Sequence, residues 1–203
     1  MIIEGIPYFS KDRKFTQLKW DDKDALLKAF RDRVREFYIE PIKELNKQKK
    51  RPFAAGVLCV VTIDFLARIE TGWDKVYKRF KYWVKNNIKE FYTSEPDTPL
   101  QEFVDRFYED FRNGLVHEGR IKNAGQFSYD DNVLVKFDKV NGPKPIMIIN
   151  PKFLQEAISK SFEKYIKKVQ NEESIFKKFK SVLMGDFQQD VEYAKKMRRR
   201  NFR

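Results

Sequence analysis

Residues 54–69 read AAGVLCVVTIDFLARI and, on a helix that begins after Pro52, are apolar on nearly every side. A helix of this composition is buried on all its faces and belongs at the centre of a bundle. The flanking sequence repeats apolar residues at three- and four-residue steps, the period of amphipathic helices. Only 8 Gly and 8 Pro occur in 203 residues, so turns are few. We therefore expect a mainly all-α fold, an antiparallel bundle of five to six helices.

Local signals place the ends of these helices. Asp21 or Asp22 is expected to cap the first helix, which Pro41 should kink or interrupt. Asn150 is expected to cap, and Pro151 to open, a later helix. The remaining helices are expected to run from Pro52, from about residue 73 to 91, from near residue 99 to Gly119, and from about residue 172.

Residues 133–137 and 146–149 break the helical pattern. Both runs are β-rich, and an Asn-Gly-Pro sequence at 141–143 separates them, so a β-hairpin is expected at about residues 132–149. The hairpin is expected to form an insertion, at about residues 127–150, in a single helical domain over residues 1–190. Residues 191–203 are expected to be a basic, frayed C-terminal tail.

Cysteine and histidine content removes several classes of site. Cys59 is the only cysteine, so no intramolecular disulfide can form, and His117 is the only histidine, so no ordinary zinc site is available. The first residues lack the pattern of a signal peptide, and the uncharged run 52–63 is shorter than a membrane span. We expect a soluble, cytoplasmic protein with no cofactor and no membrane partner.

The net charge of +12 suggests a polyanionic partner. The charge is unevenly spread, at +4 for residues 1–50, +2 for 51–100, −1 for 101–150 and +7 for 151–203. A basic surface gives sequence-independent affinity for nucleic acid because it neutralises phosphates. The alternative is a lysine-rich surface that interacts only with solvent. Of the two, charge favours nucleic acid.

Lysines at positions 75, 78, 81, 85 and 89 gather on one side of the third expected helix, with Tyr82 among them. Such a stripe could track a phosphate backbone, or it could be an ordinary solvated face, and the sequence favours neither. If RNA is the partner, the candidate contacts are Lys78, Lys81, Lys85, Arg120, Lys196, Arg198, Arg199 and Arg200.

The sequence FRNGLVHEGRIK, residues 111–122, places His117 near the end of a helix with a stripe of phenylalanines. On an ideal α-helix, Asn113 and His117 lie one turn apart on nearly the same face. Arg112 lies about 140° around the helix from His117 and about 7.5 Å along its axis, a separation that its long side chain can span. Gly114 is expected to leave the helix surface open to a ligand. The three polar side chains could therefore meet at one phosphodiester.

These residue types suit phosphodiester chemistry. The C-terminal end of the helix and the adjacent Glu118 favour the imidazolium form of His117. Its ring could accept a proton from a ribose 2′-hydroxyl or donate one to a leaving 5′-oxygen. Arg112 would neutralise the charge that builds up in the transition state. Together they would cleave RNA through a 2′,3′-cyclic phosphate, a reaction that needs no metal.

Simpler interpretations stay open. His117 could merely cap its helix while Arg112 pairs with a nearby carboxylate. Asp64, the one carboxylate in the apolar helix, needs a partner because an isolated buried charge is costly. Arg68, one turn later, is the ordinary candidate. The functional alternative is that Asp64 orients Arg112 or His117.

The sequence RNGLVH, residues 112–117, resembles the RxxxxH motif of HEPN domains, with a polar residue after the arginine. HEPN domains are small all-α bundles found in bacterial and archaeal toxins, abortive-infection proteins and CRISPR effectors. The resemblance covers the second to fifth expected helices, while the hairpin and the long basic C-terminal part depart from the pattern. It implies a homodimer whose two motif helices form one ribonuclease cleft, with Arg112, Asn113 and His117 as the catalytic set.

Three functions are compatible with these observations. The first is a HEPN-type, metal-independent endoribonuclease, a toxin or antiviral-defence protein, whose partners would be RNA, a second copy and an antitoxin or defence-system protein. The second is a non-catalytic HEPN module that binds RNA or protein, for example as one half of a two-component system. The third is a helical nucleic-acid-binding protein whose motif is accidental. The intact Arg112–His117 pair favours the first.

Overall fold

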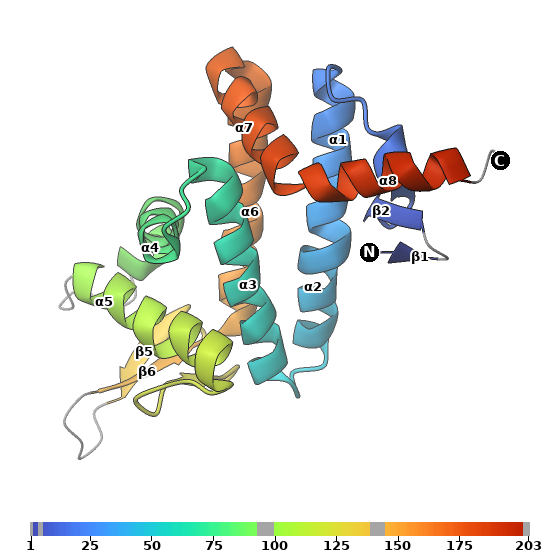
Figure 1. Ribbon diagram of the computed structural model, residues 1–203. Coiled ribbons are helices and arrows are strands. Elements are labelled where there is room, and N and C mark those ends of the chain that lie inside the picture. The colour runs from blue at the N-terminus through green and yellow to red at the C-terminus, as the bar shows by residue number, and fades with distance from the viewer. Residues whose placement is uncertain (1, 4–5, 93–99, 139–144, 201–203) are drawn as a thin grey trace. The chain divides into compact units, whose positions relative to one another are not determined.

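The computed structural model describes residues 2–3, 6–92, 100–138 and 145–200 (Figure 1). Its contacts separate into two compact units, which we call the middle unit (residues 41–162) and the terminal unit (residues 1–40 and 163–203). The sequence predicts one domain over residues 1–190. Phenylalanine rings contact one another within each unit. Each unit therefore has an aromatic core of its own.

The middle unit is built on α3 (Pro52–Thr71), the apolar helix expected at the centre of the fold. Helix α4 (Val76–Asn87) crosses α3 and packs against it, and α5 (Leu100–Arg106) packs on α4 (Figure 1). The π-helix η4 (Phe107–Glu118) continues α5 and contacts both α3 and α4. A 3₁₀ turn, η3 (Lys89–Tyr92), follows α4, and the loop expected after it lies outside the described residues. The mainly helical fold class is confirmed.

Three short strands complete the middle unit, β4 (Gln126–Phe127), β5 (Val135–Asp138) and β6 (Ile146–Ile149). Strands β5 and β6 pair antiparallel with Val135 opposite Ile149, which confirms the expected hairpin. The turn between them lies outside the described residues. Strand β4 pairs in parallel with the other edge of β6. It was not predicted, because two residues are too few to show a period-two pattern.

Helix α6 (Pro151–Asn171) begins where β6 ends. The side-chain Oδ1 of Asn150 accepts a hydrogen bond from the Lys152 backbone N–H at 3.0 Å, as expected of a cap. Helix α6 continues from the middle unit into the terminal unit, which begins again at Glu163.

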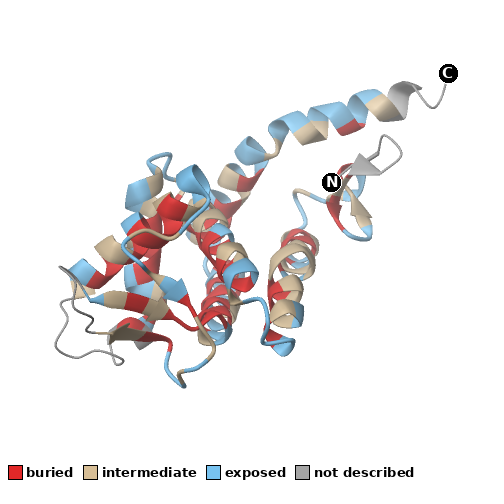
Figure 2. Cartoon of the chain, turned by 90° about the horizontal axis from the view of Figure 1, so that it is seen from below, coloured by how far each residue is buried: buried red, intermediate tan, exposed pale blue. Residues whose placement is uncertain are grey.

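Helix α3 is less enclosed than its composition suggests (Figure 2). The Phe53 and Val61 side chains are 48% and 42% exposed. By length and composition α3 could cross a membrane, since an 18-residue window has a mean hydropathy of 1.8 and half of that window is buried. The sequence argument against a span counted only the uncharged run to Ile63, whereas the helix continues to Thr71. A core helix passes the same test, so hydropathy does not decide between the two.

The terminal unit contains α1 (Lys23–Val34) and α7 (Glu173–Asp186), which the sequence predicts. Asp22 caps α1 by accepting a hydrogen bond from the Ala25 N–H at 3.0 Å. After α1 the chain passes through a π turn, η2 (Arg35–Ile39), before α2 (Glu40–Lys47). The π turn lies just ahead of Pro41, where an interruption is expected because proline has no N–H to donate.

Residues 188–200 are helical, so the expectation of a frayed tail is wrong for the described part of the C-terminal region. Helix α8 (Gln188–Arg200) packs against the N-terminal part of the chain. Ala194 of this helix is buried. Phe187 lies just before the helix begins, and its ring centroid is 5.5 Å from that of Phe9. The basic residues that suggested a tail share an amphipathic helix with these packed ones. Three short antiparallel strands, β1 (Ile2–Ile3), β2 (Ile6–Ser10) and β3 (Arg13–Lys14), were not predicted either.

Candidate functional site

Arg112 and His117 meet because η4 is a π-helix. Backbone hydrogen bonds in a π-helix join residues five apart, so side chains at i and i+5 lie one turn from each other. Arg112 Nη1 lies 3.3 Å from His117 Nε2. The ideal α-helix assumed from the sequence would separate the two residues by about 140°. The π-helix thus places Arg112 and His117 on the same side of the helix. On an α-helix, only the length of the arginine side chain could bring the two groups together.

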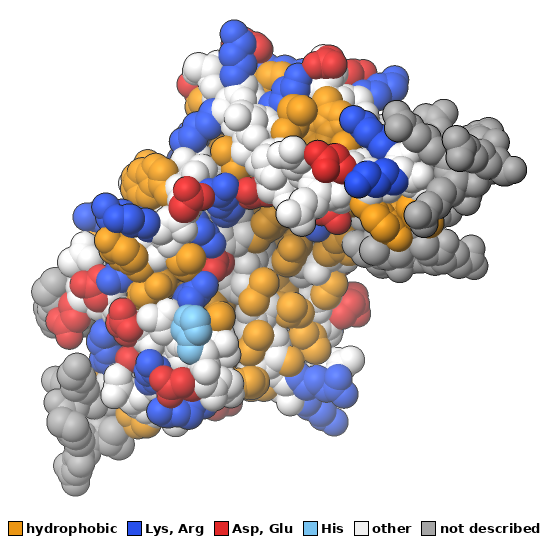
Figure 3. Space-filling view, viewed as in Figure 1, with side chains coloured by type: hydrophobic (Ala, Val, Ile, Leu, Met, Phe, Trp, Pro, Cys, Tyr) orange, Lys and Arg blue, Asp and Glu red, His pale blue; other side chains and the backbone are white. Residues whose placement is uncertain are grey.

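The Arg112 contact determines which form of the imidazole is held. Arginine can only donate, so a hydrogen bond here needs His117 Nε2 as the acceptor and the ring proton on Nδ1. His117 is exposed, and the single histidine is visible at the surface in Figure 3. A hydrogen bond from Arg112 to Nε2 requires the neutral form of the ring. A neutral, exposed imidazole is the form that can accept a proton from a substrate.

Asn113 belongs to the same hydrogen-bonded cluster. Its Oδ1 accepts a hydrogen bond from Arg112 Nη1 at 3.3 Å, and its Nδ2 donates to Glu109 Oε2 at 3.0 Å. The amide therefore orients the arginine, and Glu109 orients the amide. Sequence reasoning did not single out Glu109, although its position four residues before Asn113 on a helix is a usable signal.

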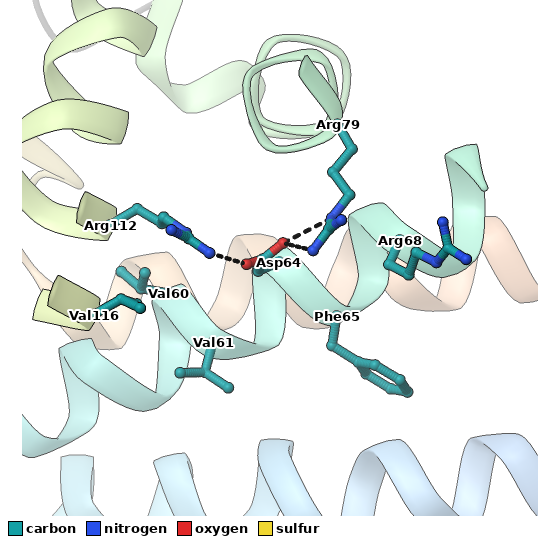
Figure 4. A pocket seen from close by; sticks show the side chains of 8 residues that line it. All are labelled: Val60, Val61, Asp64, Phe65, Arg68, Arg79, Arg112 and Val116. Atoms are coloured by element: carbon teal, nitrogen blue, oxygen red, sulfur yellow. Dashed lines mark hydrogen bonds and ion pairs between the residues drawn. The ribbon is translucent and has the colours of Figure 1, made fainter. Parts of the chain in front are cut away.

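Asp64 anchors the arginine from the neighbouring helix (Figure 4). Its Oδ2 accepts from Arg112 Nη2 at 2.9 Å, and its Oδ1 accepts from Arg79 Nε at 2.9 Å and lies 2.8 Å from Arg79 Nη2. Arg68, the ordinary partner expected from the sequence, instead donates to the Gly72 carbonyl and the Asp74 carboxylate, at 2.9 and 2.7 Å. Asp64 thus pairs with Arg112, the contact that the functional alternative requires.

Arg79 is a second residue of this cluster that sequence reasoning missed. It lies three residues after Val76 and four before Trp83, at the border between the apolar face and the lysine face of α4. A charged residue at that border can reach a carboxylate on the adjacent helix. The side chains of Arg79, Asp64 and Arg112 are only 14%, 19% and 10% exposed, so water screens their charges weakly.

The chain after η4 folds back against it and fixes the end of the motif. Gly119 ends the π-helix with φ 66°, a conformation that favours glycine, and this confirms the expected terminator. Gly114 is buried, and a Cβ there would collide with the Arg120 carbonyl oxygen. The expectation that Gly114 opens the surface to a ligand is therefore wrong. The buried Asp110 holds the same loop by accepting from Asn123 Nδ2 at 2.6 Å.

A cavity of about 340 Å³ adjoins the cluster, within the range of small-ligand pockets (Figure 4). Its walls are largely apolar, and its charged groups are three arginines and a single aspartate, which suits an anionic ligand with an apolar part. The lining residues come from α3, α4 and η4 and are Val60, Val61, Asp64, Phe65, Arg68, Arg79, Arg112 and Val116.

Glu118, which the sequence suggests as a support for His117, pairs with two residues of the chain that follows η4. Its carboxylate pairs with Lys122 Nζ at 2.7 Å and with Arg120 Nη2 at 2.6 Å. The hydrogen bond from Lys122 and the charge of Arg120 lower the pKa of Glu118. Glu118 therefore stays ionised and helps hold the loop after η4, while Arg120, a candidate RNA contact, is exposed but paired.

The other candidate RNA contacts lie in two places. Lys78 and Lys85 are exposed on α4. Lys81 pairs with Asp105 at 2.9 Å and lies over the Tyr108 ring. Lys196 is exposed on α8 in the terminal unit. The side chains of Arg198, Arg199 and Arg200 lie outside the described part of the chain, although the α8 backbone includes these residues.

Among the residues that the structure describes, no group of three or more His, Cys, Asp and Glu side chains could hold a metal ion. Cys59 is fully buried, and burial raises the pKa of its thiol. Comparison with protein-family models, with curated proteins and with solved structures finds no match to this chain. The site is therefore characterised by its geometry and chemistry alone.

Proposed function

We propose that this chain is a HEPN-type, metal-independent endoribonuclease that acts as a toxin or in antiviral defence. The observation that carries the proposal is the 3.3 Å contact between Arg112 Nη1 and His117 Nε2 on a π-helix, with Asn113 in the same cluster. π-Helical turns are rare in proteins as a whole, and those that occur are often found at functional sites. The resemblance of RNGLVH to the HEPN motif and the mainly helical fold support the same assignment.

In the proposed reaction, the neutral His117 imidazole takes the proton of a ribose 2′-hydroxyl. The 2′-oxygen attacks the adjacent phosphorus, and the bond from phosphorus to the 5′-oxygen breaks, leaving a 2′,3′-cyclic phosphate. Arg112 Nη1 would transfer its hydrogen bond from the imidazole to a phosphate oxygen and neutralise the developing charge. The leaving 5′-oxygen needs a proton from a second acid.

A homodimer would supply that acid. Two copies of η4 across a twofold axis would place a second His117 at the same phosphodiester, and the interface would use the same patch on both copies. The second ring would have to be released from its own Arg112 and carry a proton from solvent, as imidazolium, to donate to the leaving 5′-oxygen. Val116, next to the histidine, is 50% exposed and Val61 is 42% exposed, which gives this surface apolar area to bury. We expect sedimentation at micromolar concentration to give the mass of a dimer. A strict monomer with full activity would contradict this.

The lysines of α4 and the basic residues of α8 would provide affinity rather than chemistry. Lys78, Lys85 and Lys196 are exposed, so they can reach phosphates, and each contact adds sequence-independent affinity. Lys81 contributes less than the sequence suggests because its charge already faces Asp105. We further propose that the partner protein is an antitoxin or a defence-system protein and that the chain acts in the cytoplasm.

The competing proposal is a non-catalytic HEPN module that binds RNA or protein. The observation in its favour is that both terminal nitrogens of Arg112 are engaged, Nη2 with Asp64 and Nη1 with Asn113 and His117. The Arg112 side chain is also only 10% exposed. A guanidinium held in this way could simply be structural, and only a measurement of cleavage separates the two proposals.

The test is cleavage of single-stranded RNAs and tRNAs by the purified protein, with and without EDTA. We expect cleavage in both conditions, with products that carry a 5′-hydroxyl and a 2′,3′-cyclic phosphate. Cleavage that EDTA abolishes, or products with a 5′-phosphate, would contradict the proposed chemistry. Binding of RNA without cleavage would support the non-catalytic module.

A further inference from the structure

One face of α4 carries a stripe of lysines interrupted by a tyrosine. Lys75, Lys78, Tyr82 and Lys85 follow one another at three- and four-residue steps, the spacing of one helix face. All four residues are exposed. Lys81 lies outside this series and is paired with Asp105. The stripe is therefore a row of cations with one aromatic ring at its centre.

Trp73 extends the aromatic part of this face. It lies between α3 and α4, its ring centroid is 5.0 Å from that of Tyr82, and the two rings are tilted by 59°. Trp73 is 43% exposed and Tyr82 is 44% exposed. The two adjacent rings form a small exposed aromatic patch. We name Trp73 and Tyr82 the aromatic platform.

The backbone of Trp73 is fixed in place. Its N–H donates to Thr71 Oγ1 at 3.2 Å, and its carbonyl accepts from Arg79 Nη1 at 3.3 Å. Arg79 is the residue that also pairs with Asp64, which in turn holds Arg112. A single arginine therefore connects the aromatic platform to the cluster at His117.

We propose that the aromatic platform binds single-stranded RNA, with bases stacked on Trp73 and Tyr82 and phosphates held by Lys78 and Lys85. This inference rests on the proposed function, because it names the substrate class of the same enzyme. Aromatic rings with flanking cations are the means by which proteins hold single strands, since each unpaired base has a face that can stack. Bases in a duplex are already stacked on each other and cannot use the platform.

A protein partner would fit this surface less well. Protein interfaces are enriched in Trp and Tyr but depleted of lysine, whereas here lysines flank the rings on both sides along α4. The charge of the stripe is complementary to a phosphate backbone with about one negative charge per nucleotide. The arrangement of rings and charges thus selects a nucleic acid, and the need for free base faces selects a single strand.

The test is equilibrium binding of a labelled 2′-O-methyl RNA, which has no free 2′-hydroxyl and so cannot be cleaved by the proposed reaction. We compare the single strand with the same sequence as a duplex, at several salt concentrations. Trp73→Ala is expected to weaken single-strand binding about 10-fold or more, with the salt slope unchanged. Lys78→Gln with Lys85→Gln is expected to reduce the slope of log K against log salt by about 1.4.

Two further variants serve as controls. Phe53→Ala removes an exposed aromatic ring, 48% exposed, at the opposite end of α3, and it is expected to leave binding unchanged. Trp73→Phe keeps a ring that can stack and is expected to retain most of the affinity. The proposal would be overturned if Trp73→Ala bound the single strand as tightly as the wild type, or if this variant lost as much affinity for the duplex as for the single strand. It would also be overturned if the wild type bound no RNA, a result that would favour a protein partner for this face.

This experiment can fail independently of the proposed function. If the wild type cleaves RNA but Trp73→Ala binds the single strand normally, the aromatic platform is wrong and the nuclease assignment stands. If Trp73 is required for binding single strands but no RNA is cleaved, the aromatic platform stands and the nuclease assignment fails.

Discussion

Replacing His117 with alanine is expected to slow RNA cleavage by about 10²- to 10⁴-fold, the usual contribution of a general acid or base. The side chain lies exposed at the end of η4, so its removal leaves no cavity in the core. Arg112 Nη1 keeps its contact with Asn113 when the imidazole is removed. The loss should therefore be chemical, with RNA affinity nearly unchanged and the same circular dichroism spectrum as the wild type.

His117→Gln separates chemistry from positioning. The glutamine amide oxygen can still accept a hydrogen bond from Arg112, but the amide cannot exchange a proton at neutral pH. We expect His117→Gln to be nearly as slow as His117→Ala. If glutamine restores most of the rate, His117 only positions Arg112. Equal cleavage by His117→Ala and the wild type would remove the nuclease activity from this motif altogether. Val133→Ala is the control for a surface substitution. Val133 is 42% exposed, lies in the same unit and is outside the cluster, so this variant should cleave RNA like the wild type.

The helical fold could be predicted from the sequence because its signals are local. The apolar period, the Asp22 cap and the Asn150 cap each depend on a few neighbouring residues, and the structure contains them. The division into two units depends instead on which phenylalanines meet across the chain. Phe9 contacts Phe187 and Phe111 contacts Phe127, and no local pattern shows these pairings.

The candidate site was predicted by residue type but not by geometry. Arg112, Asn113 and His117 could be recognised as a motif, yet their contacts depend on a π-helix, and the sequence argument assumed α-helical angles. The role of Gly114 was misjudged because the chain that approaches it, at Arg120, comes from the loop after the helix. Such contacts are set by tertiary packing, which spacing along one helix does not report.

Replacing Asp64 with alanine is expected to lower the free energy of unfolding of the middle unit by about 3 kcal/mol, as when one partner of a buried ion pair is removed. The Arg79 and Arg112 side chains, 14% and 10% exposed, would then lose the carboxylate that they share. The matched control is Asp74→Ala. The Asp74 carboxylate also pairs with an arginine, Arg68, but it is 94% exposed, so its loss should cost less than about 1 kcal/mol.

Urea unfolding followed by tryptophan fluorescence can isolate the relevant unit. The chain has three tryptophans, and Trp20 lies in the terminal unit. In a Trp20→Phe background the signal comes from Trp73 and the buried Trp83, both in the middle unit. A shift in Asp64→Ala no larger than that in Asp74→Ala would show that Asp64 is not the anchor of Arg112.

The order of three variants tests whether one carboxylate serves both arginines. Arg79→Ala leaves the Asp64–Arg112 pair intact. Asp64→Ala leaves two guanidinium groups close together with no anion between them. Arg79→Ala should therefore destabilise the middle unit less than Asp64→Ala. Asp64→Asn keeps the shape and one acceptor oxygen, but it removes the charge and replaces the second acceptor with an NH2 donor. Its stability should fall between the two. If Arg79→Ala is the most damaging of the three, the main role of Arg79 is its hydrogen bonds to the Trp73 and Asp74 carbonyls. In that case Asp64 would hold Arg112 without needing a second cation.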